Sequence, residues 1–275
     1  DKVILRLNII NVPQTLDSPL KITFGLHATP VKPMPKNWRT WRAYTAWPVN
    51  NFQMPEFIHN GGILIPWTFK PLFKYYGSPE IGDLNLLKEI TTNCDKVGTF
   101  TCPYWRAAGT SPNIPPWKYY KYQWTGYPLD IDWGGDVAQM GDNLTGQCPK
   151  GDGWIDYIVS RFFENFDLGK VDGYYQDGFG AGGCRNLSHG CGYIDTTGRV
   201  RETYPIFATR EMFKRIYVAL KEKRPDCRII GHITNTMQIP ILSFADMFLE
   251  AECVADDACF RVRGKPVARW NGWYS

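Results

Sequence analysis

Three carboxylates stand at the ends of two predicted strands, and they are the residues best suited to chemistry. Asp177 ends an apolar-edged run within VDGYYQDGFG (171–180), where a glycine follows it directly. Glu250 and Glu252 fall on one face at the end of the strand predicted within ADMFLEAEC. Cleavage of a glycosidic bond requires two carboxyl groups, a proton donor and a nucleophile or base. Asp177 with Glu250 or Glu252 meets that requirement.

These carboxylates also have a plainer interpretation. Asp-Gly is a common turn pair, so Asp177 would cap the next element or accept a hydrogen bond from a loop amide. The two glutamates would lie in a solvated loop or pair with Arg261 or Arg263. Asp246 begins the last predicted strand and is therefore expected at the opposite rim from the glutamates.

Polar and aromatic side chains near the same strand ends are candidates for substrate binding. His232 and Asn235 in GHITNT would bond sugar hydroxyls or orient a carboxylate; the alternative is a core histidine and a helix N-cap. The candidates for contact with sugar rings are Tyr175, Trp67, Trp105 and Trp133. Trp105 and Trp133 lie in a stretch without periodicity, residues 105–152, whose length and aromatic content indicate function. Aromatic loops also serve protein interfaces.

The cysteines favour an oxidising compartment and predict no metal site. Eight cysteines are present, and the pairs 94/102, 184/191 and 253/259 close short loops without the spacing of a zinc site. Asn143 and Asn186 stand in N-glycosylation sequons. Together these signals predict a secreted, extracellular or cell-surface protein. Buried reduced cysteines in a cytosolic protein are the alternative. No cofactor is expected.

Six predicted strands alternate with predicted helices. The strands cover residues 43–48, 62–68, 97–104, 171–177, 228–233 and 246–250, and helical periodicity covers residues 83–97, 153–169 and 205–226. Asp83 is placed as a helix N-cap and Pro225 as a helix stop. This order predicts an α/β fold of the (β/α)8-barrel type, incomplete in this segment, over residues 40–275. Residues 1–39 read as the last strands of a preceding β domain and a Pro-rich linker.

Charge and hydropathy exclude two classes of partner. The net charge is +4 and no basic run occurs, so nucleic acid is not expected as a partner. The longest apolar stretch, residues 61–69, falls well short of the roughly 20 residues that cross a bilayer. The expected partner is carbohydrate, with further domains of the same chain and extracellular self-assembly as additional expectations.

Three stretches of the sequence resemble one known family. FGLHATPVKPMPKNWR (24–39), VDGYYQDG and DMFLEAE are similar to the domain junction and barrel of glycoside hydrolase family 123-like proteins. The resemblance implies a β-sandwich followed by a (β/α) barrel that acts on carbohydrate. In that family an adjacent Asp-Glu pair acts on N-acetylated sugars, whereas here Asp177 is followed by Gly178. The proton donor would then be Glu250 or Glu252.

A weaker similarity links YYQDG to α-galactosidase-like barrels, in which a strand-end Asp is the nucleophile. The sequence therefore predicts a secreted glycoside hydrolase-like protein. The alternative is a non-catalytic extracellular domain that binds carbohydrate or builds a surface assembly or filament.

Overall fold

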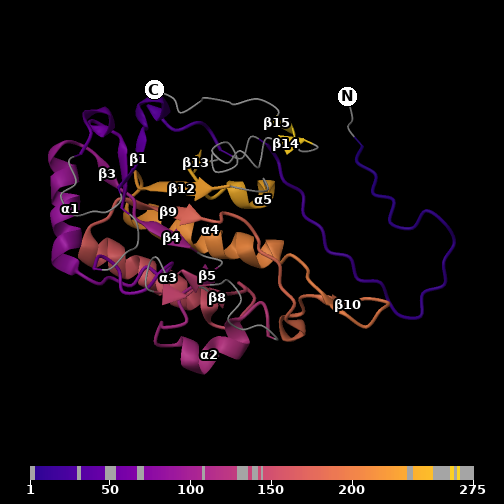
Figure 1. Cartoon of the computed structure of the whole chain (residues 1–275). Coiled ribbons are helices and arrows are strands. Elements are labelled where there is room, and N and C mark those ends of the chain that lie inside the picture. Colours follow the sequence, from indigo (N-terminus) through magenta and orange to yellow (C-terminus); the bar gives the residue numbers. More distant parts are fainter. Residues whose placement is uncertain are drawn as a thin grey trace.

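A computed structural model of the chain shows the architecture (Figure 1). It describes residues 4–29, 32–46, 54–66, 71–106, 109–128, 136–137, 142–143, 145–233, 238–249, 261–262 and 265–266.

Parallel strands form the centre of the described chain. They are β1 (Ala43–Ala46), β2 (Ile63–Pro66), β3 (Phe100–Thr101), β4 (Tyr104–Arg106), β9 (Gly173–Asp177), β12 (Arg228–His232) and β13 (Met247–Leu249). One sheet has the order β1-β2-β3 and the other β13-β12-β9-β4, and each neighbouring pair is parallel. Each of the six predicted strands is therefore present.

The two sheets meet in one interrupted strand. Only Cys102 and Pro103 separate β3 from β4, and Pro103 has no N–H to donate to a ladder. Its carbonyl still accepts from the Tyr175 N–H at 2.9 Å, and Asp172 N–H donates to the Thr101 carbonyl at 2.8 Å. The parallel strands therefore follow one another as β1-β2-β3/β4-β9-β12-β13, as in part of a (β/α) barrel.

Helices cross between the strands, as the periodicity predicts. They are α1 (Leu84–Lys96), α2 (Trp117–Trp124), α3 (Trp154–Glu164), α4 (Ile206–Lys223) and α5 (Ile239–Leu242), with a π-helix, η4 (Asn165–Gly169), continuing α3. The Asp83 carboxylate accepts from the Leu86 N–H at 3.0 Å, which confirms the predicted N-cap. α4 ends two residues before Pro225. α2 lies in the stretch where the sequence shows no period.

Short elements occupy the connections. The 3₁₀ turns are η1 (Trp38–Thr40), η2 (Glu56–Ile58) and η5 (Leu187–His189); the short antiparallel pairs are β5 (Gly109–Thr110) with β8 (Thr145–Gly146), β6 (Asp136–Val137) with β7 (Asp142–Asn143), β10 (Tyr193–Ile194) with β11 (Val200–Arg201), and β14 (Arg261–Val262) with β15 (Lys265–Pro266).

Side-chain alternation along β9 separates two cores. Tyr174 packs into the larger cluster, which is formed with the helices, and Tyr175 into a smaller cluster between strands that includes Ile63 and Ile230. Both faces of β9 are therefore covered, which is typical of a parallel strand in a barrel. Trp105 lies on the helix side of β4, where its ring meets Phe162 edge-on at 4.4 Å.

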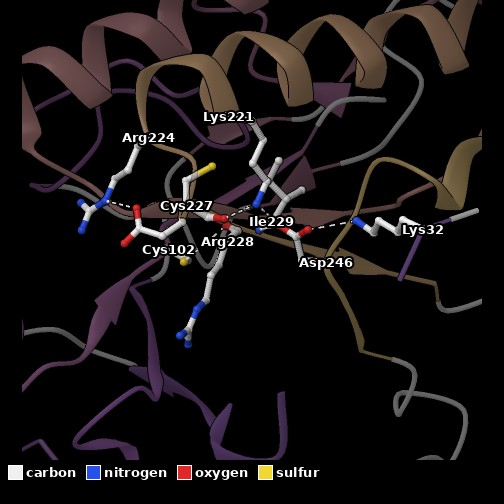
Figure 2. Close-up of polar contacts among 9 residues, drawn as sticks. Lys32, Cys102, Lys221, Arg224, Cys227, Arg228, Ile229 and Asp246 are labelled. Atoms are coloured by element: carbon white, nitrogen blue, oxygen red, sulfur yellow. Dashed lines mark hydrogen bonds and ion pairs between the residues drawn. The ribbon is translucent and has the colours of Figure 1, made fainter. Parts of the chain in front are cut away.

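Partly buried ion pairs lie at the N-terminal ends of the strands, at the opposite end of the sheet from Asp177 (Figure 2). Asp246 is 6% exposed at its side chain and pairs with Lys32 and Lys221, each at 2.9 Å. Its Oδ2 also accepts from the Ile229 N–H at 3.1 Å. These contacts connect the N-terminal segment, the end of α4 and the start of β12. Asp246 therefore lies at the rim where the sequence predicts it.

The N-terminal segment has no strand within residues 4–29. Its alternating apolar side chains are exposed, for example Ile4 and Phe24. A strand requires a partner strand, and the described residues provide none here. The preceding β domain therefore stays a prediction. No helix in the described chain is long and apolar enough to span a membrane.

Candidate functional site

β9 lies between β12 and β4 in its parallel sheet (Figure 1). Asp177 is the last residue of β9. It pairs in register with Arg106 at the end of β4. Gly178 follows with φ 67°, a left-handed conformation in which a residue without a Cβ is unstrained, and an added Cβ would meet nothing within 4 Å. The chain therefore turns sharply after Asp177. In a (β/α) barrel this end of the strands carries the functional groups.

Three side chains from neighbouring strands hold the Asp177 carboxylate. The Tyr104 hydroxyl donates to Oδ2, and the Arg106 guanidinium lies 3.7 Å from the same oxygen. His232 Nδ1, at the end of β12, lies 3.2 Å from Oδ1. The Tyr76 hydroxyl lies 3.0 Å from that of Tyr104 and extends the network. Both carboxylate oxygens are thus engaged, and the side chain remains 21% exposed.

The environment of Asp177 keeps it ionised. Burial by itself raises the pKa of this carboxyl, but the hydrogen bond to His232, the charge of Arg106 and the hydrogen bond from Tyr104 together bring the pKa below its ordinary value. Burial and the neighbouring Asp177 raise the pKa of Tyr104, so Tyr104 stays a hydroxyl donor. An ionised carboxylate accepts protons or attacks as a nucleophile. It is a poor proton donor.

The aromatic ring of Tyr175 packs between the groups that hold Asp177. Its ring stacks on Tyr104 with a centroid distance of 5.6 Å and lies 5.8 Å from the His232 ring. Tyr175 and His232 are each 4% exposed. In this structure they position the carboxylate and offer no free face to a sugar. Of the interpretations considered for His232, the contacts match a buried histidine that orients a carboxylate and not one that bonds sugar hydroxyls.

The structure corrects the prediction for Trp105. We expected its ring to stack on sugar, yet it is 1% exposed and packs between Phe162 and Tyr174. Successive residues of a strand point to opposite faces, so Trp105 points away from the face that carries Tyr104 and Arg106. The predicted site residues Glu250, Glu252, Asn235, Trp67 and Trp133 lie outside the described residues.

The structure also corrects predictions for the sequons and cysteines. Asn186 is 4% exposed, and its side-chain nitrogen donates to the Thr125 carbonyl at 3.0 Å, so the folded chain leaves no room for a glycan there. The side chain of Asn143 lies outside the described part. The described cysteines are free thiols in this structure, so the disulfides expected in an oxidising compartment are not shown. Cys253 and Cys259 are not among the described residues.

Two features of the chain were missed at the level of sequence. Tyr104 begins β4 and Arg106 ends it, two residues beyond the predicted end of the strand at residue 104, and no local sequence signal indicated that their side chains approach Asp177. The second feature is a group with metal-ligand character away from Asp177, formed by Cys148, Cys184 and His189. A hollow of about 570 Å³ is bordered by residues 127–128, 185–188 and 198–200 and does not include Asp177.

The fold is similar to that of known glycoside hydrolases with (β/α)8 barrels. A trehalose-6-phosphate hydrolase from Bacillus licheniformis matches with a TM-score of 0.52 and 12% identity over 80% of this chain and 50% of its own. A maltogenic α-amylase from Thermotoga neapolitana matches with a TM-score of 0.51 and 8% identity over 80% of this chain and 51% of its own. An α-amylase from Lactobacillus plantarum matches with a TM-score of 0.50 and 10% identity over 79% of this chain and 54% of its own.

These likenesses support part of a (β/α) barrel as the fold and carry no information about the activity of this chain. The chain spans about half the length of each of these structures. No protein-family model and no curated protein matches the chain.

Proposed function

We propose that this barrel hydrolyses glycosidic bonds with Asp177 as the ionised carboxylate of the pair. The observation that carries the proposal is the convergence of Tyr104, Arg106 and His232 on Asp177 at the C-terminal end of a central barrel strand. A carboxylate held in this way suits the nucleophile, the base that activates water, or the group that steers a substrate acetamide. Fold similarity alone fixes none of these activities.

The proton donor in this proposal is Glu250 or Glu252. Asp177 is unsuited to that role, and its sequence neighbour is Gly178 rather than an acid. Because Gly178 stands where family 123-like proteins have the second acid of the Asp-Glu pair, N-acetylated sugars are tested beside other glycosides and are not assumed to be the substrates. The extracellular or cell-surface location stays a prediction.

The experiment is hydrolysis of a panel of aryl glycosides and polysaccharides by the wild-type chain and by Asp177→Asn. The variant is expected to lose activity by at least about 100-fold, the scale of a catalytic acid or base. Asp156→Asn is the matched control, because Asp156 is an exposed carboxylate paired with Arg215 on the outer helices. Circular dichroism checks that each variant is folded. Equal turnover by wild type and Asp177→Asn would refute the role of Asp177.

Azide separates the roles open to Asp177. If Asp177 is the nucleophile, Asp177→Ala leaves a space where the carboxylate stood. Azide can enter that space, attack the anomeric carbon and expel the aryl alcohol, so that a glycosyl azide forms. Without rescue, the base or acetamide-steering role remains. If no substrate is turned over and glycans are still retained on an array, the barrel is the non-catalytic carbohydrate-binding domain named as the alternative.

A further inference from the structure

A cluster of buried thiols lies in the loops outside the barrel strands. Cys148 follows β8, and Cys184 and Cys191 flank η5 in the long segment after β9. Their exposed fractions are 2%, 1% and 2%, and they form a cluster separate from the two barrel cores. His189, at the end of η5, is half-buried beside them. Residues far apart in sequence thus bring three sulfurs and an imidazole together.

The distances within this cluster match a tetrahedral metal site. The ligand atoms of Cys148, Cys184 and His189 all lie within 4.8 Å of one another. His189 Nδ1 lies 3.6 Å from Cys184 Sγ. Zinc bonds of about 2.3 Å to sulfur and about 2.0 Å to nitrogen, at the tetrahedral angle, place these two atoms about 3.6 Å apart.

The surroundings fix the histidine in the tautomer that a metal needs. His189 Nε2 lies 2.6 Å from the backbone carbonyl of Gln123. Asn186 Nδ2 also lies 3.2 Å from Nε2, but its N–H groups donate to the carbonyls of Tyr122 and Thr125. A carbonyl only accepts, so Nε2 carries the proton and Nδ1 presents its lone pair toward Cys184. Metal-bound histidines commonly use their other ring nitrogen in this way.

Backbone amides support the sulfurs as well. The Asn186 N–H donates to Cys184 Sγ at 3.5 Å, and the Lys150 N–H donates to Cys148 Sγ at 3.4 Å. Such N–H donors stabilise the negative charge that thiolates carry as metal ligands. A disulfide between two of the thiols would explain neither these donors nor the orientation of the histidine, and it would leave the third thiol alone.

We propose that Cys148, Cys184, Cys191 and His189 bind a structural Zn²⁺ ion. Cys191 is assigned as the fourth ligand, because it belongs to the same cluster of buried thiols. Its sulfur is not among the ligand atoms that lie within 4.8 Å of one another, so the Cys191 side chain must move toward the ion. A set of four protein ligands leaves no open position for a substrate, which is typical of a structural site. The ion joins the end of the 105–152 stretch to the segment after Asp177. It thereby fixes the loops on the side of the barrel that carries the proposed activity.

The test measures metal on the full chain purified without affinity tags that bind metal. Elemental analysis is expected to find zinc equimolar with protein. Replacement by Co²⁺ is expected to give thiolate charge-transfer bands and the intense visible bands of tetrahedral cobalt. A chelator is expected to release the zinc and lower the Tm.

Two variants make the assignment specific. His189→Ala removes a half-buried ligand and is expected to weaken zinc binding in a chelator competition by more than the about 100-fold that loss of a supporting contact costs. Cys227→Ala is the matched control, because Cys227 is equally buried but lies in the helix-side core. It is expected to leave zinc binding unchanged.

The proposal is overturned if the native chain contains no zinc and gives no tetrahedral cobalt spectrum. It is likewise overturned if alkylation and mass spectrometry find two of the three cysteines in a disulfide, or if His189→Ala binds zinc as tightly as the wild type.

Discussion

Asp172 is expected to make the protein less stable as the pH rises from about 4 to about 6. Its side chain is 2% exposed, pairs with Arg224 and accepts from the Thr101 N–H at 2.6 Å. Burial raises the pKa from 3.8 to about 6, although Thr101 and Arg224 act in the opposite direction. With a higher pKa in the folded state, the unfolded chain gives up its proton first, so increasing pH favours unfolding. A difference of about two units between the folded and unfolded pKa values of Asp172 corresponds to about 3 kcal/mol of unfolding free energy.

The assay is urea unfolding of the wild type and Asp172→Asn across this pH range. The difference in the free energy of unfolding between the two proteins isolates Asp172, because the other groups titrate in both. We expect wild-type stability relative to the variant to fall by about 2 to 3 kcal/mol between pH of about 4 and about 7. Asp167 is an exposed carboxylate paired with Lys223. The unfolding free energy of Asp167→Asn is therefore expected to change with pH in the same way as that of the wild type. Parallel curves for wild type and Asp172→Asn would refute the reasoning.

Two further substitutions test the packing that positions the site. Asp246→Asn leaves Lys32 and Lys221 without their shared buried carboxylate. It is expected to lower the unfolding free energy measured in urea by about 3 kcal/mol. A change below about 1 kcal/mol would contradict the view that these ion pairs stabilise the fold. Gly173→Ala places a Cβ 1.8 Å from the Arg228 carbonyl and must separate β9 from β12, so we expect a loss of about 3 kcal/mol or more, and an unchanged urea midpoint would count against the strand register.

The parallel strands could be predicted because each is a short apolar run bounded by turn residues or helices. The strand at residues 171–177 is an example, since both of its faces are buried and its end coincides with an Asp-Gly turn. The break at Cys102 and Pro103 was not predicted, although proline gives its physical reason. Trp105 was misassigned because the sequence does not say which face of a strand packs against helices and which against other strands.

The contacts around Asp177 could be predicted only in part. His232 was placed at the correct end of its strand by the same pattern that placed Asp177. Arg106 and Tyr104 depend on the register between β4 and β9, which long-range packing sets. The thiol cluster was not predicted for the same reason, because long-range packing brings its residues together. Cys148 is 36 residues from Cys184, and local spacing alone does not bring them together.

The geometry of the strands also bears on the partner of Asp177. β12 pairs with both β9 and β13, and its register places Leu249, the last described residue of β13, level with His232 and hence with the end of β9. Two strand spacings separate β13 from β9, about 10 Å across the sheet. Retaining glycosidases hold their carboxyl groups about 5 Å apart and inverting ones about 6.5 to 9.5 Å. The strand spacing at Leu249 is therefore closer to the inverting than to the retaining separation, and under the proposed function it favours Asp177 as the base that activates water.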